Sequence, residues 1–575
     1  KARFPTVASA ALAAHRFRPP SFCMRLPLFA PLVLWLLAPG LLGFAVPSAA
    51  QPSTADSPRA PEGATSLRGV VWTPPEQAAP ARAVLRQMKA AGMTAARLTR
   101  PLPEAALPTA DTLGLRLFVD LPAAYVTAHT ARGKQPRLIS AARALARLAK
   151  THASLHAVGL VQNADTRDAE MCDLIDQWTS TVQQHNASLQ TYYVTAFPPD
   201  VDACATVPGR VLVDLRGTDA PLERWRQWQQ ASARSGVGAV GTWTAPDAAP
   251  GLHVPHSPER QARTLETLLP PLLAEAPVVF VSRWRDAPPE GPRRYGLHDA
   301  NGRPRPALAV VQGLYTGAQT VFALPTGRSP EPATTRVVLL GWGLIGMLLL
   351  LYARRPGAQR AAYRYVRAHP FYRDVLREGR DVLPVFSLAL LVHALSTFGL
   401  VVYAVGRGLA TMERITLLVE SLPPGVREII VAWLSMPAFA GAAAAATLGG
   451  ASALWMLTLT GVAQRYGRFT LRQALMLVAW PCWTAVPGLV VVLVLPSVAS
   501  VEITTLVLLA ATALALCSTL VRVLRDYASV TAVPWPVAAS LALPSPLVLL
   551  LLSGIGAALA ASLSVRLLAA LLWHA

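Results

Sequence analysis

Several acidic residues of this chain follow short apolar runs, where a carboxylate can stand at the end of a strand. Asp120 closes the run LRLFVD, and Asp214 closes RVLVD. Asp165 comes two residues after LHAVGLVQN, and Asp286 comes two residues after PVVFVSRW. Carboxylates act as general acids, general bases and nucleophiles when they face a bound substrate. We therefore treat Asp165, Asp214 and Asp286 as candidate catalytic residues.

Aromatic residues accompany the same kind of run. Trp72 closes GVVW, Tyr193 lies in LQTYYVT, Trp243 closes GVGAVGTW and Trp284 closes PVVFVSRW. Such rings present a large apolar body with a polar handle, which suits contact with the apolar face of a sugar. The same rings can equally fill the mouth of a barrel. Both interpretations stay open.

Alternating strand and helix patterns position these residues. The β-rich runs are 69–72, 93–98, 115–121, 155–163, 189–195, 210–216, 236–243 and 277–284, and the helical patterns between them include 80–92, 138–153 and 221–236. This alternation predicts a (β/α)8 barrel of the α/β class, whose strand ends meet at one opening. A doubly wound sheet is the alternative, but its glycine-rich phosphate loop is missing from VVWTPPEQ.

Two segments resemble glycoside hydrolase family 2, one of the retaining (β/α)8 glycoside hydrolases. Residues 87–122 read as a helix, a Gly-x-x-x-x-Arg strand, a Pro-containing loop, a helix ending in Leu-Gly and a strand running to an acid. Residues 280–308 resemble the last strand and closing segment of the family. The resemblance covers about residues 69–316 and implies a sugar-binding opening. Its substrate-binding candidates are Trp72, Arg97, Asp120, Asn163, Tyr193, Trp243 and Trp284.

The resemblance also implies two catalytic glutamates that this chain lacks. The acid/base of the family is the Glu of an Asn-Glu pair ending strand four, where this chain has Asn163 and Ala164. The nucleophile is a Glu ending strand seven, where this chain has Thr242 or Trp243. Alanine cannot transfer a proton, and threonine does not replace a carboxylate beside an oxocarbenium ion. We therefore expect a barrel without glycosidase activity.

Other acids could form a relocated catalytic pair. Asp165, Asp214 and Asp286 all belong to the ends of predicted strands, where the sites of such barrels lie. The simpler interpretation gives these acids structural roles. They would then cap helices or pair with arginines, among them Arg97, Arg100, Arg216 and Arg285.

The first part of the chain carries targeting features. Residues 24–50 have a charged start, an apolar stretch and the small residues PSAA, which predicts a signal peptide cleaved before Gln51. An uncleaved anchor is the alternative. Residues 51–68 are a predicted linker. The exported part contains Cys172 and Cys204, which an oxidising compartment permits to pair. Two isolated buried thiols are equally compatible with the sequence.

Long apolar runs follow a second predicted linker, 317–335. They predict six transmembrane helices, at 337–353, 384–405, 438–462, 474–495, 503–521 and 547–565. The preceding stretch IIVAWLSMP would lie in the interface or extend the third helix across Pro437. Pro481 and Pro487 are expected to kink the fourth. The small residues of 438–453 predict close helix packing or a homo-oligomer.

The net charge of +20 does not indicate nucleic-acid binding, because most of the excess arginine flanks apolar runs. Arginines crowd the segment 354–383 and the loops near 465–472 and 522–525, which the positive-inside rule places in the cytoplasm. The loop 406–428 balances its charges. The barrel is then expected outside a bacterial inner membrane, with the basic segment along the anionic inner leaflet. The lipid bilayer is thus an expected partner.

The membrane half shows little that could drive transport. His393 is the clear ionisable residue within a predicted span, and it serves either as a packing residue or as a relay. Residues 368–570 weakly resemble the Yip family of multi-span membrane proteins, through HPFYRDVL and GRFTLRQALMLVAWPCW. That resemblance implies a scaffold, with 336–353 as a separate span and 384–575 as the Yip-like domain.

Three functions remain open at this stage. The first is a membrane-anchored barrel that binds a glycan or a protein partner without cutting it. The second is an active glycosidase with relocated carboxylates, and the third is a membrane scaffold with a passive barrel. No Cys/His metal spacing or phosphate loop occurs, so we expect no cofactor and no metal.

Overall fold

The computed structural model describes residues 66–560, except 247, 287–292, 329–333, 381, 413–414 and 423. The fold below belongs to the unit that begins at Gly63. The predicted signal peptide at 24–50 and nearly all of the linker at 51–68 lie outside the described residues.

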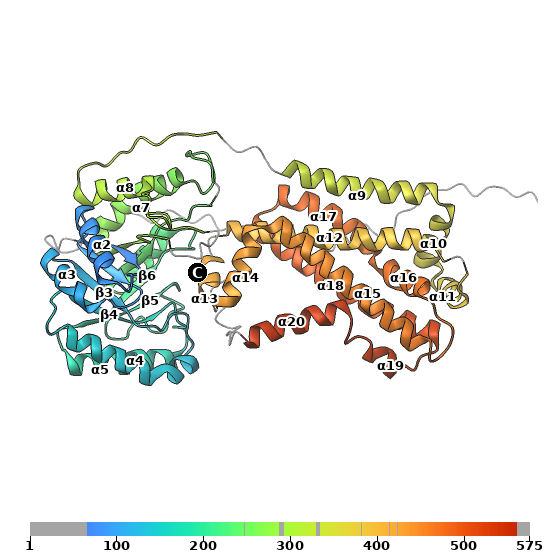
Figure 1. Ribbon diagram of the computed structural model, residues 1–575, viewed down its shortest axis with the longest axis horizontal. Helices are drawn as coiled ribbons and strands as arrows, with labels where there is room; N and C mark the ends of the chain where they lie inside the picture. The colour runs from blue at the N-terminus through green and yellow to red at the C-terminus, as the bar shows by residue number, and fades with distance from the viewer. Residues whose placement is uncertain are drawn as a thin grey trace, which may run out of the picture. The chain divides into compact units, whose positions relative to one another are not determined.

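Eight parallel strands form a closed barrel in chain order (Figure 1). They are β1 Leu67–Trp72, β2 Ala95–Leu98, β3 Arg116–Asp120, β4 Leu155–Gln162, β5 Gln190–Thr195, β6 Arg210–Asp214, β7 Ser235–Val240 and β8 Val278–Ser282. The barrel closes because β1 pairs with β8 in parallel, with Gly69 beside Phe280. All eight strands of the predicted barrel are therefore confirmed.

Helices follow most strands and cover the outside of the barrel (Figure 1). They are α2 Ala78–Ala90, α3 Leu107–Leu113, α4 Ala128–Leu148, α5 Ala169–His185, α6 Pro221–Ala231, α7 Pro258–Glu275 and α8 Pro306–Thr316. The helix predicted at 138–153 begins earlier, because Thr127 and Thr130 form a reciprocal capping box at its start. The helix predicted at 221–236 ends at Ala231, since β7 begins at Ser235.

The alternation of side chains along each strand divides the apolar core into two layers. On β5, Tyr192 belongs to the interior cluster with Phe118 and Phe280, whereas Tyr193 belongs to the cluster between strands and helices. The interior is crowded: a Cβ on Gly69 would lie 2.6 Å from the Phe280 ring. Glycine at this position makes room for that ring.

The region after the barrel is helical. Its helices are α9 Thr334–Arg354, α10 Pro356–Arg367, α11 His369–Glu378, α12 Pro384–Thr411, α13 Ile415–Ser421, α14 Pro424–Ser435, α15 Pro437–Ala463, α16 Leu471–Ala479, α17 Ala485–Val498, α18 Val501–Thr531, α19 Trp535–Ser540 and α20 Pro546–Ala560, and short 3-10 helices lie at Glu104–Ala106 (η1) and Trp480–Thr484 (η2).

Among the described residues, five stretches are long and apolar enough to cross a membrane. They are Val337–Arg354, Pro384–Thr411, Pro437–Ala463, Leu471–Pro496 and Ile503–Thr531. Each coincides with one of the first five predicted spans. The sixth, at 547–565, runs past the last described residue, and α20 covers its described part. The IIVAWLSMP stretch forms part of α14, which a break at Met436 separates from α15.

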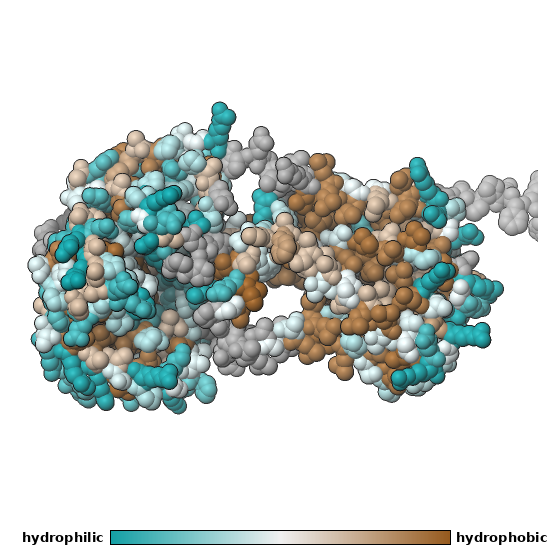
Figure 2. All heavy atoms as spheres, in the orientation of Figure 1, coloured by the Kyte–Doolittle hydropathy of each residue, from teal (hydrophilic) through white to brown (hydrophobic). Residues whose placement is uncertain are grey.

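Exposed apolar side chains distinguish this helical region from the barrel. Among the described residues, every exposed large apolar side chain lies at Val321 or beyond. Leu339, Phe439 and Leu506, for example, are 66%, 74% and 70% exposed. Figure 2 shows hydrophobic residues over this region and mostly hydrophilic residues over the visible face of the barrel. Such a surface is what a helix bundle presents to lipid.

Small residues and one acid hold parts of the helical region together. Gly399 of α12 and Gly441 of α15 approach so closely that a Cβ on Gly441 would lie 2.5 Å from the Gly399 carbonyl oxygen. Asp526 of α18 is buried and accepts hydrogen bonds from His369 Nε2 at 3.0 Å and Arg373 Nε at 2.8 Å. These contacts fix α11, within the basic segment, to α18.

Candidate functional site

The ends of the barrel strands bring together much of the predicted site. Within the barrel, Arg97 on β2 donates to Asp120 on β3 through Nη2 at 2.9 Å and Nε at 3.2 Å. The Tyr192 hydroxyl donates to the same carboxylate at 2.6 Å. Arg97 Nη1 donates to the Gly238 carbonyl at 2.9 Å. All polar groups of this buried cluster are therefore satisfied by one another.

A second polar cluster lies where β4 and β6 end. Asn163 Nδ2 donates to Asp214 Oδ2 at 2.9 Å. Arg216 donates to the same carboxylate through Nη2 at 2.7 Å and Nε at 3.0 Å. Asn163 has a φ of +48°, in the left-handed region that a non-glycine residue rarely adopts. Its Oδ1 is buried and has no hydrogen-bond partner among the described residues. Ala164 beside it is fully buried.

The two other candidate acids are also paired with arginines. Asp165 accepts hydrogen bonds from Arg167 at 2.7 and 2.9 Å. Asp286 accepts from Arg305 Nη2 at 2.5 Å and from the Gly296 amide at 2.7 Å. The partner of Asp286 is thus Arg305, whereas Arg285 donates to the Ala300 carbonyl. In both cases an arginine thus occupies carboxylate oxygens through charge-assisted hydrogen bonds.

The four candidate aromatic residues are all buried. Trp72, Tyr193, Trp243 and Trp284 are 3%, 2%, 4% and 3% exposed. Trp72, Tyr193 and Trp284 pack in the layer between strands and helices. The Tyr193 hydroxyl donates to Asp202 at 3.3 Å. The four rings are packed inside the protein, and their role in sugar binding remains a prediction.

Trp243, at the end of β7, is enclosed by charged and aromatic neighbours. His256 stacks on its ring with centroids 3.6 Å apart, and the Arg293 guanidinium lies 5.0 Å from the ring centroid. Burial, with Arg293 and Arg260, lowers the pKa of His256 to about 4. The stacked imidazole is therefore neutral at physiological pH. Thr242, the other residue at this strand end, has its carbonyl bound by Gln261 Nε2 at 3.1 Å.

Glu420 of α13 completes the barrel mouth, and sequence reasoning missed it. Arg216 Nη1 donates to Glu420 Oε1 at 3.1 Å, and Arg283 Nη2 donates to the same oxygen at 3.2 Å. The Tyr125 hydroxyl donates to Oε2 at 2.9 Å and accepts from Asn163 Nδ2 at 3.5 Å. We name the group Tyr125, Asn163, Asp214, Arg216 and Arg283 the mouth cluster.

The charges of the mouth cluster keep Glu420 ionised. Burial would raise the pKa of Glu420, but Arg216 and Arg283 outweigh it and lower that pKa to about 2. Burial also raises the pKa of the Tyr125 phenol, so its hydroxyl remains a hydrogen-bond donor. A carboxylate with such a low pKa does not supply a proton near neutral pH.

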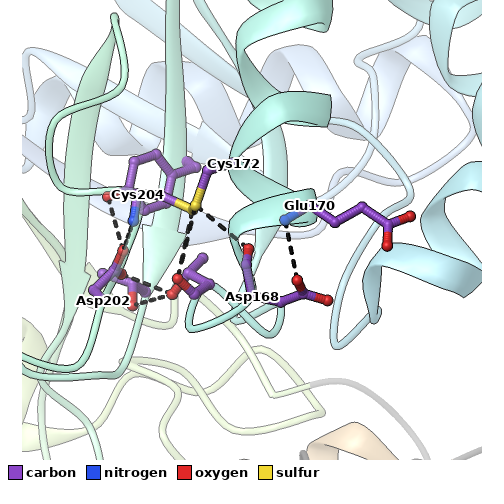
Figure 3. The surroundings of a disulfide bond; sticks show 8 residues. Asp168, Glu170, Cys172, Asp202 and Cys204 are labelled. Atoms are coloured by element: carbon purple, nitrogen blue, oxygen red, sulfur yellow. Dashed lines mark hydrogen bonds between the residues drawn. A yellow bond between two sulfur atoms is a disulfide. The ribbon is translucent and has the colours of Figure 1, made fainter.

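A disulfide lies at the edge of this face, where Cys172 of α5 joins Cys204 of the segment between β5 and β6 (Figure 3). Asp202 beside it is buried and accepts hydrogen bonds from Thr166 Oγ1 at 2.7 Å and the Cys204 amide at 2.9 Å. Burial raises the pKa of Asp202 to about 6. Asp202 thus has the elevated pKa of a proton donor but is only 4% exposed, so a substrate cannot reach it in this structure.

Metal ligands do not cluster in the part of the chain that the structure describes. No three His, Cys, Asp or Glu side chains there could hold one metal ion.

Comparison with known proteins gives matches in structure alone. No protein-family model and no curated protein matches the chain. Its structure is similar to a GH2 β-galacturonidase from Eisenbergiella tayi bound to galacturonate (16% identity, TM-score 0.39, covering 45% of this chain and 52% of that one). It is also similar to a β-D-glucuronidase of Dictyoglomus thermophilum (13% identity, TM-score 0.40, covering 45% of this chain and 52% of that one). A β-glucuronidase of Bacteroides uniformis is similar as well (17% identity, TM-score 0.38, covering 44% of this chain and 35% of that one). The chain spans about half the length of the first structures it matches.

The residues missed in the sequence had weak local signals. Tyr125 lies in the loop after β3 with a φ of +52°, and Arg283 directly follows β8. Glu420 belongs to the loop 406–428, whose balanced charge contrasts with the arginine-rich loops. That contrast sets the loop apart, but it does not predict which acid pairs with which arginine.

Proposed function

We propose that this protein is a membrane-anchored, exported barrel that binds a glycan and does not cleave it. The pairing of Asp120, Asp165, Asp214 and Asp286 with Arg97, Arg167, Arg216 and Arg305 is the observation that carries the proposal. A retaining glycosidase needs one carboxylic acid that gives up a proton and one free carboxylate facing it. Arginine-bound carboxylates serve neither need well.

The side chains at the two family positions support the same proposal. Asn163 is followed by buried Ala164, and β7 is followed by Thr242 and enclosed Trp243. Binding remains feasible, because the mouth cluster offers amide, hydroxyl and guanidinium groups to hydroxyl-bearing ligands. The resemblance of two segments to glycoside hydrolase family 2 makes a saccharide the class of ligand to test first.

Anchoring is supported by the five apolar helices, and export of the barrel is supported by the disulfide. Disulfides persist in oxidising compartments, which suits a barrel held outside a bacterial inner membrane. The arginine-rich segment at 354–383 then faces the cytoplasm. Following its weak resemblance to the Yip family, we further propose that 384–575 is a scaffold-like membrane domain.

The test uses the full chain in detergent micelles. We expect binding of at least one glycan on an array and no hydrolysis of a panel of aryl glycosides. Hydrolysis that is lost in Asp214→Asn would instead establish an active enzyme with relocated carboxylates. Absence of both binding and hydrolysis would leave the scaffold, for which the occupation of the barrel mouth by Glu420 is the favouring observation.

A further inference from the structure

The mouth cluster carries one more positive charge than its own acid neutralises. Asp214 binds Nε and Nη2 of Arg216, which leaves Nη1 for another partner. Arg283 adds a second guanidinium. Without Glu420, these two cations would face the single carboxylate of Asp214. Guanidinium groups recognise carboxylates with directed, charge-assisted hydrogen bonds. The barrel therefore offers a place for one additional carboxylate.

Glu420 shows how a carboxylate fits that place. Both of its oxygens are engaged, Oε1 by the two arginines and Oε2 by the Tyr125 hydroxyl. Its side chain is 22% exposed, so the carboxylate lies at the opening and not deep within the barrel. A ligand approaching from solvent would meet the same donors.

The ion pairs of Glu420 are supported by few other contacts near α13: Arg293 donates to the Leu409 and Ala410 carbonyls at the end of neighbouring α12, at 3.0 and 3.1 Å. Helix α13 has seven residues, and its buried Leu417 forms a small apolar cluster with Ala196 of the barrel. One such contact contributes only about 1 to 2 kcal/mol. A competing carboxylate that gains contacts elsewhere in the mouth can therefore displace Glu420.

Asn163 supplies the contact that Glu420 leaves unused. Its buried Oδ1 has no hydrogen-bond partner among the described residues, although its Nδ2 is bound to Asp214. Asn163 and Tyr125 both have left-handed backbone angles, and such strained residues gather at functional sites. An acceptor without a partner favours a ligand with hydroxyl donors. A sugar acid combines hydroxyl donors with a carboxylate, whereas a glutamate side chain lacks them.

We infer that the barrel mouth is a binding site for an acidic saccharide, whose carboxylate replaces that of Glu420 on Arg216 and Arg283. α13 is then a built-in competitor that the ligand has to displace. This inference rests on the proposed function, because it names the ligand class of the same opening. The carboxylate binds to the arginines, and a hydroxyl group donates to Asn163 Oδ1.

The test is calorimetric titration of the full chain in detergent micelles with glucuronate, and with glucose as the matched neutral sugar. Glu420→Gln removes the competing charge and keeps the shape of the side chain. We expect it to bind glucuronate about tenfold or more tightly than the wild type, since an intramolecular competitor has a high effective concentration. Glu428→Gln, in neighbouring α14, is the control and should behave as the wild type.

Arg283→Gln in the Glu420→Gln background should remove the gain in glucuronate affinity. Equal affinity of wild type and Glu420→Gln for glucuronate would overturn the inference. So would glucose binding as tightly as glucuronate, and glutamate binding as tightly would show that the ligand is not a saccharide. If an array shows only neutral glycans bound, the proposed function stands and this inference falls; if no variant binds any glycan, both fall.

Discussion

In the barrel, several charged side chains are buried and large apolar side chains are covered, whereas the described helical region exposes many of its large apolar side chains. Arg97, Asp120, Asp214 and Arg216 are all less than 10% exposed. Along the helices, Leu506 and Phe439 are mostly exposed. A barrel in water covers its apolar atoms and pairs the charges it buries, while helices in lipid need only satisfy their backbone. The exposed apolar side chains of the helical region thus suggest association with a lipid bilayer.

The helical region also buries a charged side chain. Asp526 is 2% exposed and is bound by Arg373 and His369 of α11, near the end of α18. A buried acid in either region is tolerated through the same means, a basic partner within hydrogen-bond distance. The two regions thus differ in the side chains they expose, whereas both stabilise a buried acid with a basic partner.

The largest effect is expected from breaking the interior ion pair of the barrel. Arg97→Ala leaves Asp120 buried with only the Tyr192 hydroxyl, and loss of one partner of a buried pair costs about 3 to 5 kcal/mol. Denaturant unfolding of the full chain in detergent measures the loss. Arg132→Ala is the control, because its pair with Glu170 is exposed and worth at most about 1 kcal/mol. Equal losses in both variants would show that burial does not set the value of these pairs.

The disulfide gives the next largest effect and belongs to the barrel alone. Replacing Cys172 and Cys204 by Ala opens a link across 32 residues, which in the loop-entropy account costs about 3 to 4 kcal/mol. Unfolding with and without a reductant should show the same loss in the wild type and none in the double variant. Cys517→Ala, at an exposed free cysteine of α18, should leave stability unchanged. A reductant without effect on the wild type would argue against the bond.

A pH dependence of stability is expected from buried Asp202. Burial raises its pKa to about 6 from the ordinary 3.8, so the folded state binds this proton more tightly than the unfolded state. Stability should therefore decrease as the pH rises from about 4 to 6, by at most about 3 kcal/mol. Asp202→Asn should flatten this part of the profile and be more stable than the wild type above pH 6.

The control for that profile is Asp176→Asn, at an exposed position of α5. Unfolding midpoints measured between pH 4 and 8 should follow the wild type in this variant. An Asp202→Asn variant with an unchanged profile would show that another group titrates in this range.

The fold was more accessible to sequence reasoning than the site. Each of the eight strands and five apolar helices can be recognised from its own residues, through side-chain alternation or continuous apolar length. Asn163 and Asp214 were placed at the mouth because strand ends meet there in any such barrel. Arg305 was missed as the partner of Asp286, because the two come together only through the folded closing segment.

The contact between Glu420 and Arg216 is more distant still, since 204 residues separate them in sequence. No periodicity or local motif encodes such a pair; it arises from where α13 lies after both regions have folded. The substrate-binding roles of Trp72, Arg97, Asp120, Tyr193, Trp243 and Trp284 likewise remain predictions. Their burial in this structure shows how readily strand-end residues serve the core.

The smallest effect is expected at the contact between helices α12 and α15. Gly441→Ala adds a methyl group 2.5 Å from the Gly399 carbonyl, so α12 and α15 have to separate. Overpacking of this kind costs about 1 to 3 kcal/mol, partly offset by the higher helix propensity of alanine. Gly461→Ala, on the same helix with nothing within 4 Å, gains the propensity without the clash. Thermal unfolding in detergent should therefore shift in opposite directions for the two variants. A stabilising Gly441→Ala would contradict the close approach of α12 and α15 at these two glycines.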